Sequence, residues 1–146
     1  MADERALLKL RQLQSRQASE ALAREEARCR EIEAQLVQAV AAYDALEADI
    51  HQQRSSRIES MIQRPTHTLT MARLRLQHSA DDEELAERGR AIVAIRDQLN
   101  AAREICDAAR LAAQAAAKAE KKVTELVARL AWQAEIRHDA LTEEEH

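Results

Sequence analysis

The stretch Ile62-Gln63-Arg64-Pro65-Thr66-His67-Thr68 decides how this chain folds. Pro65 is the only proline in 146 residues, and the only glycine, Gly89, lies well beyond it. Proline lacks a backbone donor and disfavours helical conformation in the residue before it, so a helix should end near Arg64. The threonines that follow suit the cap of a new helix. We therefore expect helices over about 2–64 and 69–141, with a turn over about 65–68.

The composition is that of long helices. Aromatic residues make up 1% of the chain and charged residues 33%, and Ala, Leu, Glu, Gln and Arg dominate. Disorder is the rival interpretation, but the apolar residues are periodic and Pro and Gly are almost absent. The formal net charge of −4 gives no general attraction to nucleic acid or anionic membranes. Two cysteines, no long apolar run and no signal-peptide core predict a cytosolic protein.

Both predicted helices carry a seven-residue repeat of apolar positions, which is the pattern of a coiled-coil seam. Between Ala18 and Ile50, Glu25 is the one charged residue at a seam position. The a series of the first helix is Leu8, Leu22, Cys29, Leu36, Tyr43 and Ile50, and its d series is Ala18, Ile32, Ala39 and Leu46. The a series of the second is Leu85, Ile92, Leu99, Cys106, Ala113, Glu120, Val127, Ala134 and Leu141, and its d series is Ile95, Ala102, Ala109, Ala116, Val123 and Leu130.

The start of the second helix has two interpretations. Ser79 followed by acids resembles a helix start, so an interruption before Ala80 is one alternative. Met71 and Leu74 keep the heptad register, which favours an unbroken helix from near Thr68.

These features predict an all-α fold: one long antiparallel two-helix coiled-coil hairpin over residues 1–146. A tight turn pairs Leu36 with Ile95 and Ile32 with Leu99. A slip of one heptad instead pairs Leu36 with Ala102 and Tyr43 with Ile95, and the sequence permits both. The first helix should be roughly 90 Å long, with the last 10–20 residues or so of the second extending beyond it. The end of the chain from Glu143 should fray.

Two groups of apolar residues fall off the seam and so need another explanation. Near the chain ends, Leu10, Leu13 and Trp132 lie at outward positions close to basic residues. Isolated surface hydrophobes are common, but an outward Trp beside Arg and Lys suits a protein interface, which we favour.

The second group lies at the bend. Leu69 and Leu76 fall at outward positions around Arg73 and Arg75, and residues 51–78 contain five arginines against one acid. These residues either pack the turn itself or form a basic docking end. An RNA-binding arm is a third use, but no aromatic is present there to stack a base.

The sequence offers little for catalysis. Glu135 and His138 have the Glu-x-x-His spacing of a di-iron ligand pair, but a second copy is missing. Cys29 and Cys106 sit at a positions, where a thiol acts as a small buried hydrophobe. One glycine rules out a Gly-rich phosphate loop, and two helices enclose no sizeable pocket. We therefore expect no catalytic residues, no metal and no cofactor.

The segment Lys118-Ala-Glu-Lys-Lys-Val-Thr-Glu-Leu-Val-Ala-Arg, with the acidic end that starts at Leu141, resembles the central stalk proteins of type III secretion systems. This is the YscO/HrpO group, related to the flagellar export protein FliJ. The local likeness covers about Lys118–Glu145, and the likeness in length and two-helix layout covers the whole chain. The resemblance implies a coiled-coil hairpin that links a hexameric export ATPase to the membrane export gate.

The resemblance also implies which residues meet which partner. The free ends would enter the ATPase ring, and the bend, with Leu69, Arg73 and Leu76, would face the export gate. Secretion chaperones are a further implied partner of the group. The implied ATPase-binding residues are Leu10, Leu13, Lys122, Glu125, Arg129 and Trp132.

The resulting functional prediction is a non-enzymatic stalk that promotes ATPase assembly and activity, peripheral to an inner-membrane secretion apparatus. It should be a monomer that binds no nucleic acid and inserts in no membrane. A generic coiled-coil adaptor or dimerisation protein is the alternative, in which the chain stays extended and pairs with another copy.

Overall fold

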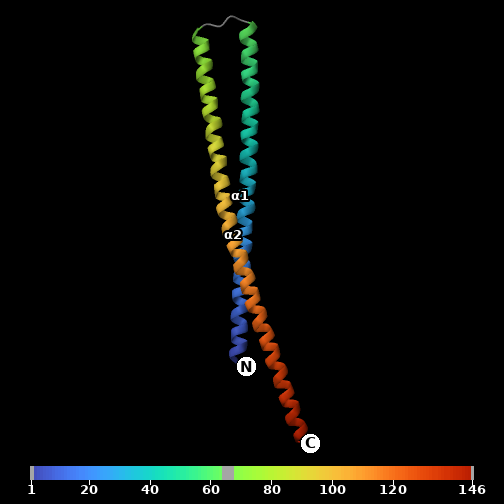
Figure 1. Cartoon of the computed structure of the whole chain (residues 1–146). Helices are drawn as coiled ribbons and strands as arrows, with labels where there is room; N and C mark the ends of the chain where they lie inside the picture. Colours follow the sequence, from blue (N-terminus) through green and yellow to red (C-terminus); the bar gives the residue numbers. More distant parts are fainter. Residues whose placement is uncertain (1, 64–67, 146) are drawn as a thin grey trace. The chain divides into compact units, whose positions relative to one another are not determined.

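The computed structural model describes the backbone of residues 2–63 and 68–145, and it consists of two long helices (Figure 1). Helix α1 spans Ala2–Gln63 and helix α2 spans Thr68–Glu144. The described part of the chain contains no strand, and the two helices pack against each other as an antiparallel hairpin. The predicted fold class is therefore confirmed. The predicted turn at Pro65 lies outside the described residues.

Helix α2 runs without interruption from Thr68, so the chain adopts the early start rather than a break before Ala80. It continues to Glu144, three residues beyond the expected end. The reason is local, because most residues between Thr68 and Glu144 have high helix propensity. The possible start signal at Ser79 and the acids after it is too weak to interrupt the helix.

The chain divides into two compact units, each containing part of both helices. Unit 1 comprises Met1–Arg28 and Ala102–His146, and unit 2 comprises Cys29–Ala101. Each unit is thus a short helix pair with its own row of buried side chains. The sequence predicted one continuous domain and contains no signal for this division.

In unit 2 the buried side chains are seam residues of both helices. Cys29, Ile32 and Ile50 are buried on α1, and Ile92 and Leu99 are buried on α2. All five belong to the predicted a and d series, so the heptad pattern identified this core correctly. Such a narrow seam buries one or two side chains per turn, which is why the core is a row rather than a cluster.

The contacts in unit 2 also select the register. A Cβ added at Gly89 would lie 3.8 Å from Cε2 of Tyr43. The tight-turn register places residue 88 opposite Tyr43, whereas the slipped register places Ile95 there. The ring beside Gly89 therefore agrees with the tight turn.

In unit 1 the seam contains smaller side chains. Ala102, Cys106 and Val123 are buried, and the alanines at 109, 113 and 116 are half-buried. Alanine buries little apolar area per layer, so this unit gains less hydrophobic stabilisation than one lined by Ile and Leu. Both cysteines of the chain are buried, as expected of thiols at a positions.

Gly89 is the one glycine and lies inside a helix, so it should cost stability. The nearest atom to an added Cβ, at 3.8 Å, is at ordinary van der Waals distance. We expect Gly89→Ala to raise the free energy of unfolding by about 1 kcal/mol, because alanine has the higher helix propensity. Urea denaturation followed by helical circular dichroism measures this change.

Serine provides the graded control at the same site. Its helix propensity lies between those of glycine and alanine, so Gly89→Ser should gain about half as much. A loss of stability in Gly89→Ala would mean that the Tyr43 ring cannot accommodate the added methyl group.

No helix in the described part of the chain is both long enough and apolar enough to cross a membrane.

Candidate protein-binding surfaces

The C-terminal end of α2 in unit 1 has no covering partner. Every side chain over residues 131–145 is exposed, whereas Leu130 is the last one half-buried at a seam position. Ala134 and Leu141 belong to the heptad series but are exposed, which agrees with the prediction that the last part of the second helix extends beyond the first. The cause is a difference in length: α1 has 62 residues and α2 has 77, so the heptad pattern continues past its partner. We call residues 131–144 the bare end of α2.

A stripe of charged residues leads to Trp132 on the outward face of α2. Lys122, Glu125, Arg129 and Trp132 follow one another at spacings of three, four and three, which keeps them on one side of the helix. All four side chains are exposed, and the Trp132 indole is 63% exposed. The structure thus presents these four predicted residues on one surface, while their role in binding an ATPase stays a prediction.

Leu10 and Leu13 are exposed too, but they belong to a different surface. They lie at c and f positions of α1, as Arg129 and Trp132 do on α2. In an antiparallel pair these outward positions of the two helices point away from each other. The structure therefore separates the predicted ATPase-binding residues into two surfaces, one on each helix of unit 1.

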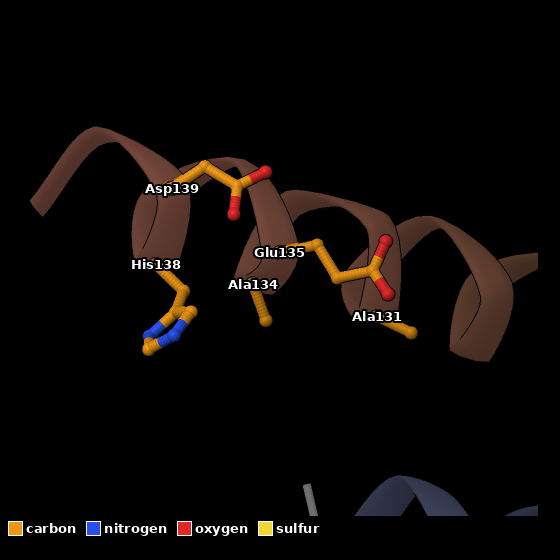
Figure 2. Close-up of a pocket in the computed structure, with 5 residues that line it drawn as sticks. All are labelled: Ala131, Ala134, Glu135, His138 and Asp139. Atoms are coloured by element: carbon orange, nitrogen blue, oxygen red, sulfur yellow. The ribbon is translucent and has the colours of Figure 1, made fainter. Parts of the chain in front are cut away.

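The seam side of the bare end is slightly hollowed (Figure 2). Ala131, Ala134 and His138 point to this side, and Asp139 points away from it, with Glu135 between (Figure 2). The side chains of Ala131 and Ala134 are short, which leaves this stretch of the helix surface low. It is an open surface against which another helix could pack closely.

Glu135 and His138 by themselves do not make up a complete set of metal ligands. Glu135 and His138 have the spacing of a helical ligand pair, but a metal site needs ligands from further elements. In the two described ranges no three His, Cys, Asp or Glu side chains are close enough to hold a metal ion.

The other predicted surface lies near the start of α2, in unit 2. Arg73 and Leu76 are exposed, and the Leu76 side chain is 72% exposed. The side chain of Leu69 lies outside the described residues. Arg73 and Leu76 are three residues apart, so they share the outer face of the helix. Their contact with an export gate stays a prediction.

The basic character of this region is weaker than the sequence indicated. Arg54 donates to Oδ1 of Asp82 at 2.6 Å and to the carbonyl of His78 at 3.1 Å. Arg57 faces Oδ2 of Asp81 at 3.8 Å. Two of the five arginines are therefore paired across the helices with acids that lie just beyond the region counted as basic.

These cross-helix ion pairs were missed in the sequence although a signal existed. Arg57 stands seven residues after Ile50 and Asp81 seven after Leu74, so both occupy seam positions. In the tight-turn register Arg57 faces Leu74 and Asp81 faces Ile50, so the two charges lie one heptad apart along the seam. The long arginine side chain still approaches the carboxylate, and opposite charges within one seam favour pairing. Counting charges over residues 51–78 did not reveal this pairing, because the count took all five arginines to face solvent and stopped before the acids at 81 and 82.

Comparison of the chain with known protein families, with curated proteins and with solved structures finds no match.

Proposed function

We propose that this chain is a non-enzymatic helical stalk, and that it binds a hexameric export ATPase through the exposed α2 surface of unit 1. The observation that carries the proposal is Trp132, whose indole is 63% exposed on a helix segment without a partner. Tryptophan is strongly enriched among residues that dominate binding energy, and leaving it in water forgoes the burial of a large apolar area.

The pattern around Trp132 suits a ring-shaped partner with charged and apolar contacts. Lys122, Glu125 and Arg129 alternate in sign along the stripe that leads to it. Such alternation fixes the register and orientation of a bound helix more than it adds affinity. A rod inside a six-fold ring can favour one conformation in some ATPase subunits only if it contacts the subunits unequally. The α1 surface with Leu10 and Leu13 and the α2 surface with Trp132 differ, so they would make unequal contacts.

The remaining roles follow from the same proposal. The start of α2, with Arg73 and Leu76, would contact the export gate, and secretion chaperones would be further ligands. The protein would act in the cytoplasm, at the face of an inner-membrane secretion apparatus. It would promote ring assembly and ATP turnover without hydrolysing ATP itself.

Trp132→Ala should weaken binding to a hexameric export ATPase of the same organism about tenfold, because the variant loses the central apolar contact. Titration of the purified ATPase with the full chain, read by binding and by ATP turnover, measures the effect. Val93→Ala is the matched control, since Val93 is an exposed apolar residue of the same helix in unit 2. Absence of binding and of stimulation by the unmodified chain at any salt concentration would contradict the proposal.

A coiled-coil adaptor or dimerisation module is the second candidate. Ala134 and Leu141 favour it, because they continue the heptad series without a partner helix. Solution mass at low protein concentration and moderate salt separates the two candidates. The stalk is a monomer under these conditions, and the adaptor is an obligate dimer.

A further inference from the structure

The bare end of α2 carries a second feature that goes beyond the proposed function. Trp132, Ile136, Asp139 and Glu143 continue the outward stripe at spacings of four, three and four, and all four side chains are exposed. The stripe therefore begins with two apolar residues and ends with two carboxylates. It is an amphipathic surface whose charge is of one sign.

The charge of this end is unbalanced. Residues 131–146 contain five acids against one base, Arg137. Within the described ranges none of these carboxylates takes part in an ion pair. The acids are Glu135, Asp139, Glu143, Glu144 and Glu145.

A surface of opposite charge and similar build lies at the start of α2. Arg73 and Arg75 are exposed there and form no ion pair with any described residue, in contrast to Arg54 and Arg57. Leu76, 72% exposed, lies beside them. Around the helix, Arg73 shares the outer face with Leu76, and Arg75 lies on the flank at the other side of Leu76. Leu76 is thus an exposed apolar side chain between two arginines that point in different directions.

From this complementarity we infer that the bare end of α2 in one copy docks on the start of α2 in a second copy. Trp132 and Ile136 pack against the partner's Leu76, and Asp139 and Glu143 face the partner's Arg73 and Arg75. A second acidic end is excluded as the occupant, because like charges at close range repel.

The contact joins two different surfaces, so in a pair one copy keeps its start of α2 unused and the other keeps its bare end unused. Such heterologous contacts build open chains rather than closed dimers. Exposed ion pairs are individually weak and are screened by salt. The association therefore depends on protein concentration and on salt. Trp132 supplies the apolar contribution to its binding free energy.

Sedimentation velocity of the full chain over a range of concentrations tests this inference. At about 20 mM salt the mean mass should rise steadily with concentration, and at about 0.5 M salt it should return to that of one chain. Trp132→Ala should weaken the association at least tenfold.

Charge reversal supplies the decisive comparison. Asp139→Lys with Glu143→Lys makes the bare end basic, and Arg73→Glu with Arg75→Glu makes the start of α2 acidic. Each double variant alone should stay monomeric, whereas a mixture of the two should associate again, because their surfaces are complementary. Arg90→Glu with Arg96→Glu is the control, since these exposed arginines lie elsewhere on α2. All substituted residues are exposed, so helical circular dichroism should remain unchanged.

Three results would overturn the inference. The first is a chain that stays monomeric at low salt and high concentration. The second is a closed dimer whose mass stops rising. The third is association that survives charge reversal, which would indicate pairing through Ala134 and Leu141 instead.

Discussion

Replacing Leu99 with alanine should lower the free energy of unfolding by about 2–4 kcal/mol, the largest effect we expect of any single substitution in this chain. Leu99 is only 4% exposed and lies in the buried seam of unit 2. Truncation removes apolar burial and leaves a cavity between two helices, and the adjacent seam residues cannot fill it without moving. Urea denaturation followed by helical circular dichroism measures the loss.

Leu111→Ala is the matched control for this experiment. Leu111 belongs to the same helix but is 67% exposed, so its truncation should change stability by no more than about 0.5 kcal/mol. Equal losses for the two variants would mean that the seam does not carry the stability of the hairpin.

Replacing Glu25 with leucine should raise the free energy of unfolding by about 2 kcal/mol. Glu25 occupies a seam position of α1 in unit 1, and its Oε2 atom is shielded from solvent without a hydrogen bond in the described part of the chain. A shielded carboxylate oxygen without a partner costs about 1–3 kcal/mol. Leucine removes this cost and adds apolar area to a seam that consists largely of alanine.

Glu31→Leu tests whether the gain depends on the seam. Glu31 lies on the exposed side of the same helix, so its replacement should leave stability within about 0.5 kcal/mol. Thermal and urea unfolding of both variants decide the matter. If Glu25→Leu destabilised the chain, the carboxylate would have a stabilising role that its surroundings do not reveal.

The Glu25 and Leu99 substitutions probe different parts of the molecule. Leu99 lies in the unit whose seam contains isoleucines, and Glu25 lies in the unit whose seam is rich in alanine. A seam of low stability in unit 1 suits a binding role, because segments that bind partners usually belong to the less stable parts of a fold. Glu25→Leu therefore also shows how much stability unit 1 lacks.

Much of the fold could be predicted because a heptad repeat is a local property of sequence. The spacing of Ile32, Ile50, Ile92 and Leu99 placed them in the seam, and all four are buried. Trp132 is exposed as well, but every side chain of the bare end is, so its exposure does not test its position in the repeat. Position in a helical repeat decides exposure wherever a partner helix is present.

The sequence alone determined that this chain forms two long helices, which side of each helix packs, and which apolar residues remain outside the seam. These properties follow from helix propensity and from the 3.6-residue period, and both act within a few turns of one helix. Only the tertiary structure decided which residues face one another, such as Tyr43 beside Gly89 and Arg54 with Asp82. Register and helix overlap depend on two segments distant in sequence, and a seven-residue repeat looks the same after a shift of one heptad.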